Sequence, residues 1–406
     1  MVELLSGLEV SESLSAFVVD VVAPMGRVEQ RRNAEAYVAG MLGQGGRKSL
    51  QPVVERQGGD GAEYQSLQQF LADSPWMPEP VLQCVAERVC PQIGVWAWII
   101  DDTGWVKQGK NSPGVKRQYS GTLGKTGNCQ IGVSLHAAGG RGTLPLGWSL
   151  YLPEDWCGDA ERRRKAKIPE DVEFRTKPEL ALALAQSAAG WQVTRAPVLG
   201  DIAYGINTSL RTGLHAEGFE YVLSIDASIN LYDASTTFTK RKRTSTNGRP
   251  PSKLYANRKP RSVSDIASSL RNDDFRMVEY RASDSRDRRC KSRFAFVRVI
   301  AAHPIDHDNE IPREEWLIVE WPIDADSPTD YWISNMPANT SRKKLAQLAR
   351  LRWMIELDYK QLKGHLGLDH YEGRSWLGWH HHACLVTVAH AWLTEQRLNP
   401  FAPRPA

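Results

Sequence analysis

The sequence predicts an α/β protein with a helical N-terminal region and a β-rich insertion. Residues 28–89 show loosely amphipathic helical patterns that Gly-rich breaks interrupt. From Gly94 onwards, short apolar runs typical of buried strands alternate with helical patterns. Residues 228–337 contain several β-like runs in succession, which favours an antiparallel arrangement for that part of the chain.

The N-terminal region predicts four short helices, each bounded by glycine or by Ser74-Pro75. We place them at 29–42, 50–57, 64–72 and 79–89. Short helices with tight turns suit a small domain that binds DNA ends, and they equally suit a plain helical subdomain.

The next part of the chain predicts strands and helices in alternation. The expected order is strand, strand, strand, helix, strand, helix, strand, at 95–102, 130–138, 143–153, 178–191, 196–205, 208–217 and 220–227. The first run ends in Asp101 and Asp102, and the fourth strand carries Asp201. Open α/β sheets bind ligands at the carboxyl ends of their strands, so we expect these acids at a functional edge.

The C-terminal part predicts one long helix at 341–368 and a second at 376–398. The expected organisation is a helical domain, a first core segment, a basic β-rich insertion, a second core segment with the long helix, and a tail. These segments span 1–92, 93–227, 228–338, 339–398 and 399–406.

Composition indicates a soluble protein. No apolar run reaches about 18 residues, so we expect no membrane partner. The first residues carry acid rather than a basic leader, and the six cysteines form no CxxC pair, which favours reduced thiols and a cytoplasmic location. The segment 240–261 holds nine Lys or Arg and no acid. It predicts an exposed loop that contacts a polyanion through Lys240, Arg241, Lys242 and Arg243, or else a merely solvated loop.

Three charged residues of the predicted long helix form a possible phosphate and metal site. Arg352, Glu356 and Lys363 would lie within about 40° of arc on one helical face. Two magnesium ions clamping the attacking and leaving oxygens of a phosphodiester need few protein carboxylates. Asp101 or Asp102, Asp201 and Glu356 would supply them, with Arg352 and Lys363 as phosphate contacts.

Each of these residues also has an ordinary structural explanation. An acid at a strand end is often an N-cap or a turn residue, and a helical Glu beside an Arg is often a surface ion pair. The metal hypothesis therefore depends on the combination. Adjacent strand residues point to opposite faces, so only one of Asp101 and Asp102 can be the ligand.

Three blocks of this sequence resemble a known family. WIIDDTGWVKQGK (98–110) with KRQYSGTLGKTGNCQIGVSLH (116–136), VLGDIAYG (198–205) and RWMIELDYKQLKGHLGLDHYEGRSW (352–376) are similar to the conserved blocks of bacterial insertion-sequence transposases. That family has a ribonuclease-H-like core and an Asp-Asp-Glu triad. One subgroup has the signature Tyr-x2-Arg-x3-Glu-x6-Lys and a β-rich insertion; here the Tyr position is Ala349.

The resemblance implies a fold, an activity and partners. The fold would be a ribonuclease-H-like mixed sheet flanked by helices. The protein would be a DNA transposase, an endonuclease that cuts double-stranded DNA at transposon ends and joins them to target DNA. It would use two magnesium ions, for which manganese can substitute, and act as a homodimer on DNA in a bacterial cell.

The resemblance also bears on single residues. The family's acid two residues before Thr or Ser selects Asp101, ahead of Thr103, with Asp102 as the alternative. Basic residues in the Gly-punctuated loop after it are expected to contact DNA: Lys107, Lys110, Lys116, Arg117 and Lys125.

The alternatives to a transposase are a catalytically silent DNA-binding descendant and a structure-specific nuclease on the same fold.

Overall fold

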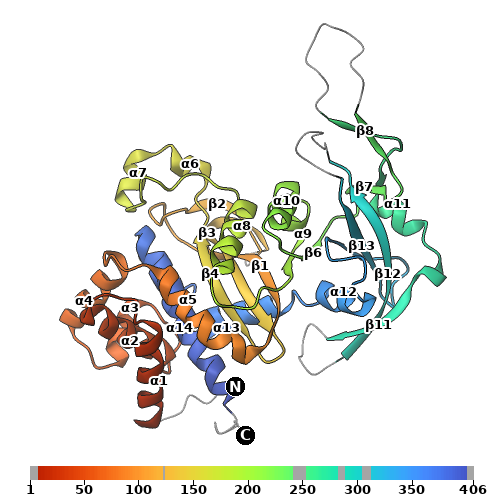
Figure 1. Ribbon diagram of the computed structural model, residues 1–406. Helices are drawn as coiled ribbons and strands as arrows, with labels where there is room; N and C mark the ends of the chain where they lie inside the picture. The colour runs from red at the N-terminus through yellow and green to blue at the C-terminus, as the bar shows by residue number, and fades with distance from the viewer. Residues whose placement is uncertain (1–7, 122–123, 241–252, 282–288, 304–311, 400–406) are drawn as a thin grey trace. The chain divides into compact units, whose positions relative to one another are not determined.

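The computed structural model describes residues 8–121, 124–240, 253–281, 289–303 and 312–399 (Figure 1). The chain divides into two compact units. The first unit contains Met1–Ala196 and Met354–Ala406, and the second contains Pro197–Trp353. Both combine helices with sheet, as the sequence predicts for an α/β protein. In the described part of the chain, no helix is long and apolar enough to cross a membrane.

The first unit begins with helices and continues with an antiparallel strand group. Its elements are α1 (Leu8–Val21), α2 (Val28–Leu42), α3 (Leu50–Arg56), α4 (Gly61–Ala72), α5 (Pro78–Ile93), β1 (Val95–Val106), β2 (Lys116–Ser120), β3 (Lys125–Gly139), β4 (Thr143–Leu150), α6 (Glu154–Cys157), α7 (Ala160–Lys165), α8 (Lys177–Ala189), α13 (Met354–Gly364) and α14 (Trp376–Leu398). The four predicted N-terminal helices are confirmed as α2 to α5, whereas α1 and β2 were not predicted.

Local sequence signals explain where several of these helices begin and end. Asp60 caps α4 in a capping box with Glu63, and Thr176 caps α8 in the same way. Pro78 opens α5, and Gly94, at φ 64°, closes it in the left-handed conformation that favours glycine.

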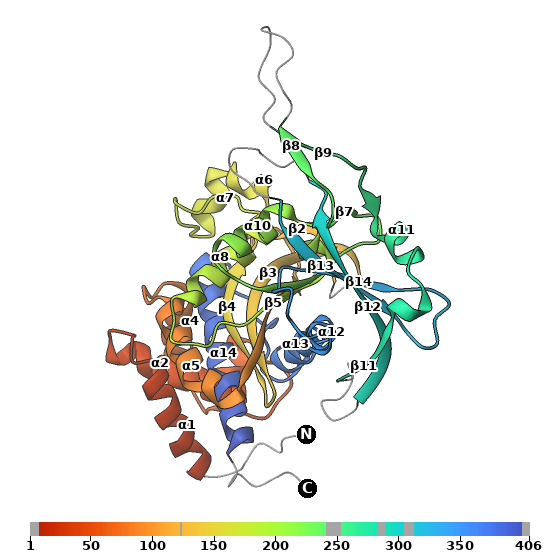
Figure 2. The same ribbon diagram turned by 45° about the vertical axis from the view of Figure 1, so that its right-hand side comes forward.

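The long strand β3 organises the sheet of the first unit. It pairs with β1 along one edge, and with β2 and β4 at successive parts of the other edge, always antiparallel. Helix α8 contacts β3 and β4, and helices α13 and α14 also pack on these strands. Helix α14 is buried on nearly every side, and α2, α4 and α5 pack around it (Figures 1 and 2).

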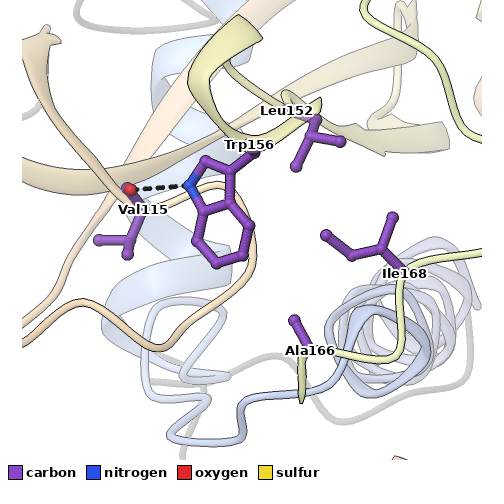
Figure 3. Packing of buried hydrophobic residues seen from close by; sticks show 5 residues of the cluster. All are labelled: Val115, Leu152, Trp156, Ala166 and Ile168. Atoms are coloured by element: carbon purple, nitrogen blue, oxygen red, sulfur yellow. Dashed lines mark hydrogen bonds between the residues drawn. The ribbon is translucent and has the colours of Figure 1, made fainter. Parts of the chain in front are cut away.

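A small apolar cluster attaches the α6–α7 segment to the sheet (Figure 3). The fully buried indole of Trp156 packs with Val115, Leu152, Ala166 and Ile168. Its Nε1 donates to the Val115 carbonyl at 2.9 Å, so the polar atom of this buried ring is satisfied. The chain just before β2 is thereby fixed to α6.

The second unit is a mixed sheet with few helices. Its elements are β5 (Val198–Gly200), α9 (Ile202–Gly205), α10 (Thr208–Ala216), β6 (Tyr221–Ser224), β7 (Asn230–Asp233), β8 (Phe238–Lys240), β9 (Leu254–Ala256), β10 (Arg261–Ser262), α11 (Val263–Ser268), a 3-10 turn (Asn272–Asp274), β11 (Arg276–Arg281), β12 (Arg289–Ala301), β13 (Glu314–Trp321), β14 (Asp330–Ser334) and α12 (Arg342–Ala349). The strand order is β10-β7-β12-β13-β14-β6-β5, with β11 also on β12. Among the described strands of this unit, β5 and β6 pair in parallel and the others pair antiparallel, so the predicted antiparallel β-rich region is confirmed.

Two expectations about the ends of elements are wrong. Strand β1 does not end at the two aspartates: it stays paired with β3 as far as Val106, so Asp101 and Asp102 lie inside the strand. The apolar run stops at Asp101, but Thr103, Gly104 and Trp105 are still buried and continue the ladder. The sequence pattern located the run and not the full strand.

The single helix predicted at 341–368 is in fact two helices. Helix α12 ends at Ala349 and α13 begins at Met354. Between them, the Arg350 guanidinium contacts the buried carboxylate of Glu320 on β13 at 3.1 Å. The break between α12 and α13 coincides with this tertiary contact and contains no Gly or Pro. The sequence therefore did not predict the break. Arg352 therefore does not share a helical face with Glu356 and Lys363.

A buried histidine joins α2, α14 and the chain after α13. His382 Nε2 donates to the carbonyls of Gly367 and Leu368, both at 3.1 Å, and Nδ1 accepts from the Tyr37 hydroxyl at 2.9 Å. This arrangement requires a neutral ring. Burial lowers the pKa of His382 from 6.5 to about 4.

We expect this histidine to make the protein sensitive to mild acid. In the unfolded chain, His382 binds a proton below pH 6.5. In the native protein, the buried ring stays neutral until the pH falls to about 4. Stability is therefore full above pH 6.5 and falls through that window, by about 2 kcal/mol at about pH 5. Urea unfolding at about pH 7.5 and about pH 5 should show this loss. His382→Asn should shrink the difference between the two pH values, and the exposed His365→Asn should leave it unchanged. An identical difference in wild type and His382→Asn would contradict this account.

Candidate active site

Polar side chains gather on one face of the β1–β3 strand pair. Asp101 lies directly opposite Ser134, and Ile99 opposite His136. Directly paired residues share a face of a sheet, as do residues two apart in a strand. Asp101, Ser134 and His136 therefore line the same face, and both β3 side chains are fully buried.

Helix α13 covers this face and makes three polar contacts with β3 and β4. Asp358 Oδ2 lies 2.7 Å from His136 Nδ1, and Asp358 Oδ1 accepts from the Thr143 hydroxyl of β4. The Tyr359 hydroxyl lies 2.6 Å from Ser134 Oγ, which in turn lies 3.0 Å from His136 Nε2. These contacts join two consecutive helical residues to the face that carries Asp101.

The carboxylate of Asp358 is the centre of this network. It is 2% exposed. Burial alone would raise its pKa, but the imidazoles of His390 and His136 hold the pKa below its usual value. His390 Nε2, from α14, lies 3.2 Å from Oδ1. Asp358 is therefore ionised, and it binds to elements on three sides.

The ionised carboxylate fixes the direction of each hydrogen bond. A carboxylate can only accept, so His136 Nδ1 donates to it. Burial lowers the pKa of His136, which keeps the ring neutral, and its Nε2 then accepts from the Ser134 hydroxyl. Ser134 Oγ is left to accept from Tyr359. Burial raises the pKa of Tyr359 well above its usual value, and the negative charge of Asp101 raises it further.

The two adjacent aspartates have different surroundings. Asp101 faces α13, and its Oδ1 accepts from the backbone N–H of Asp102 at 2.7 Å. Asp102 points to the other face, where its Oδ2 forms a 3.0 Å ion pair with Lys177 Nζ at the start of α8. Both are half-buried.

Glu356 lies exposed in the first turn of α13, three residues before Tyr359. Residues three apart in a helix are neighbours on its surface, so Glu356 is next to the residue that contacts Ser134. Further along α13, Lys363 Nζ donates to the Gly104 carbonyl of β1 at 2.8 Å. Burial lowers the pKa of Lys363 to about 8. Helix α13 is thus attached to the sheet before Leu362, through Asp358 and Tyr359, and after it, through Lys363.

The other predicted phosphate contacts differ in exposure. Lys107 is half-buried; it donates to the Tyr371 carbonyl, and burial lowers its pKa to about 8. The exposed residues are Lys110, Lys116, Arg117 and Lys125, of which Lys116 pairs with Asp155 at 2.7 Å. Arg352, half-buried, precedes α13.

The second unit holds the remaining predicted residues. Asp201 follows β5 directly and caps α9, accepting from the Tyr204 N–H at 3.3 Å. Lys240 is exposed at the end of β8, which pairs antiparallel with β9. Arg241, Lys242 and Arg243 lie outside the described residues.

The histidines of the described segments bind mainly to backbone groups. His381 and His382, on α14, each contact backbone carbonyls of different segments, and His380 Nδ1 lies 3.0 Å from the Trp376 carbonyl. His370 Nδ1 accepts from the Lys48 N–H. Within the described ranges, no group of three or more His, Cys, Asp or Glu side chains is arranged to hold a metal ion.

Sequence reasoning missed most of the buried network. The residues that it did not predict are Ser134, Tyr359, Asp358, Thr143 and His390. One signal was available: Ser134 and His136 stand two apart in an otherwise apolar strand, so both point to one buried face and need polar partners there.

Comparison with known proteins shows the family to which the chain belongs. The family of DDE (Asp-Asp-Glu) superfamily endonucleases matches residues 20–287, more than half of the chain, and the protein belongs to this family. The matched range contains Asp101 and Asp201 and ends before Glu356. A probable transposase for insertion sequence element IS701 from Microchaete diplosiphon is 30% identical over 187 residues. The match covers 46% of this chain and 43% of that relative, so the chain spans less than half of its length.

We expect loss of the Asp358 charge to destabilise the protein strongly. Asp358→Asn keeps the shape of the side chain but leaves His136 and Thr143 with a weaker acceptor and removes the carboxylate that lies 3.2 Å from His390. Breaking a buried pair costs about 3 kcal/mol or more of unfolding free energy, measurable by urea denaturation. Glu161→Gln, which breaks the exposed pair with Lys165, should leave the free energy of unfolding nearly unchanged. Equal, small effects of both variants would contradict a central role for Asp358.

Proposed function

We propose that the protein is a DNA transposase whose catalytic carboxylates are Asp101, Asp201 and Glu356. The observation that carries the proposal is the attachment of α13 to the face of β1–β3 that bears Asp101. It brings the helix of Glu356 to that face through Tyr359, Asp358 and Lys363. Membership of the DDE endonuclease family and the identity with an insertion-sequence transposase support the same activity. The proposal includes a ribonuclease-H-like core.

Taken one by one, the proposed ligands suit a divalent cation of the magnesium type. All three proposed ligands are carboxylates, the hard oxygen donors that magnesium prefers, and magnesium takes few protein ligands and keeps water or phosphate oxygens. Asp101 and Asp201 are half-buried and Glu356 is exposed to solvent. The surroundings also support Asp101 over Asp102, because Asp102 is on the opposite face and pairs with Lys177.

The chemistry proposed is in-line phosphoryl transfer on double-stranded DNA. Two bound magnesium ions, or manganese in their place, would activate the attacking oxygen and neutralise charge on the scissile phosphate. The chain's own residues would hold them and bind the DNA backbone. Water would attack first to free a 3′-hydroxyl, and that hydroxyl would then attack the target strand. Joining two ends favours a homodimer on DNA.

We expect the three carboxylates to be needed for chemistry and not for DNA binding. The assay uses a DNA duplex that carries the inverted repeats expected at the ends of the transposon, and magnesium is present. Asp101→Asn, Asp201→Asn and Glu356→Gln should each lower cleavage and strand joining roughly 100-fold or more, with DNA binding retained. Asp102→Asn should remain active.

The same assay separates the alternatives. Nicked product without joined product from the wild-type chain would indicate a structure-specific nuclease. End binding without cleavage in magnesium or manganese would indicate a silent DNA-binding protein. Wild-type activity of Asp201→Asn and Glu356→Gln would refute the mechanism.

The exposed cations of the first unit are proposed to bind DNA phosphates, together with Arg352 and with the basic segment 240–261. The half-buried Lys107 and Lys363 would contribute charge beside the site. The exposed cations include Lys110 on the chain before β2, Arg117 on β2 and Lys125 at the start of β3.

Substitution of these three cations by alanine should weaken salt-sensitive DNA binding. The slope of log affinity against log salt should become shallower by about 2 to 3 units. Fluorescence anisotropy across a salt series measures it. Lys167→Ala, which removes an exposed cation paired with Asp73, is the single-charge control. An unchanged slope in the triple variant would remove this surface from the DNA interface.

A further inference from the structure

We propose that Tyr359 is a positioning residue of the active site: its hydroxyl bond to Ser134 sets the spacing between Glu356 and Asp101, and thereby the affinity of these carboxylates for a divalent cation. The inference rests on the proposed function and deepens it. Tyr359 is one helical turn from Glu356, and its partner Ser134 is the residue directly opposite Asp101. One hydrogen bond of 2.6 Å therefore links the neighbours of the two carboxylates.

The Tyr359 hydroxyl is held in one direction. Ser134 Oγ has two side-chain partners, His136 Nε2 at 3.0 Å and Tyr359, and Ser134 donates to the first and accepts from the second. His136 is itself held by Asp358. The phenol thus ends a chain of three buried groups, and a rigid chain of this kind defines a position more closely than one surface contact does.

The ring of Tyr359 is also fixed, independently of the hydroxyl. It packs edge-on against His136, with ring centroids 5.5 Å apart, and lies 6.3 Å from Trp148. Replacing Tyr by Phe would keep this packing and remove only the hydrogen bond. The contacts of Asp358 with His136 and of Lys363 with Gly104 would still hold α13 on the sheet. A specific effect of the hydroxyl on the carboxylates can therefore be separated from unfolding.

The experiment is a manganese titration of the full-length protein without DNA, followed by electron paramagnetic resonance of free Mn²⁺. Asp101→Asn and Glu356→Gln identify the binding that belongs to the site. Tyr359→Phe should weaken that binding roughly tenfold, the range typical for groups that orient metal ligands. Ser134→Ala should act in the same direction. The double variant Tyr359→Phe/Ser134→Ala should bind Mn²⁺ no more weakly than the weaker-binding of the two single variants. The reason is that both substitutions remove the same Tyr359–Ser134 hydrogen bond. Ser134→Thr, which keeps a hydroxyl, should restore most of the affinity.

The matched control is Tyr331→Phe on β14. Its hydroxyl also makes one hydrogen bond, to the Pro328 carbonyl at 3.0 Å, and its loss should leave Mn²⁺ affinity unchanged. Thermal melting of every variant measures the purely structural effect. If Tyr359→Phe melts at a lower temperature but binds Mn²⁺ as the wild type does, the positioning role is overturned.

The outcomes distinguish the two proposals. Wild-type Mn²⁺ binding that depends on Asp101 and Glu356 but not on Tyr359 overturns the positioning role alone. Binding that none of these variants changes, together with DNA cleavage unaffected by Asp101→Asn, refutes the proposed function as well.

Discussion

The buried carboxylate of Asp358 is the interaction on which the arrangement of the site depends. Moving a charge out of water is costly, and Asp358 is tolerated only because His136, His390 and Thr143 surround it. A buried charge held by hydrogen bonds in this way contributes little net stability compared with well-packed apolar residues, but it allows few alternatives. A helix that slid or rotated by one residue would leave the charge unpaired. The network therefore specifies which face of α13 meets the sheet, and so where Glu356 emerges.

The same constraint explains why cations near the site are not all equivalent. Lys363 and Lys107 both donate to backbone carbonyls, and burial brings the pKa of each to about 8. Both side chains remain charged at neutral pH. The hydrogen bond of Lys363 holds α13 on β1, and that of Lys107 holds the end of β1 to the chain that follows Leu368. Lys110, Arg117 and Lys125 are exposed and do not hold these elements together. Long-range attraction of a polyanion can therefore be separated by mutation from the geometry of the carboxylates.

Much of the fold follows from the sequence because the signals are local. The predicted helices 29–42 and 376–398 and the strands 130–138 and 143–153 are confirmed as α2, α14, β3 and β4, since apolar periodicity records which residues face the core. The signals fail where distant contacts decide. Arg350 binds Glu320 where a continuous helix was expected, and neither residue marks a helix end in the sequence. Strand β1 passes through its two aspartates because β3 continues beside it.

The candidate site shows the same division. The spacing of Glu356 and Lys363 on one helix, and the alternation that separates Asp101 from Asp102, could be inferred because both are properties of a single element. Which aspartate meets the Glu356 helix depends on Ser134 and Tyr359, which are 225 positions apart in the chain. No local pattern couples such residues. A buried polar residue in an apolar strand does, however, announce a missing partner, and Ser134 with His136 required one on the facing helix. Asking what satisfies each buried polar group leads from β3 to Asp358 and Tyr359, and from them to the neighbouring Glu356.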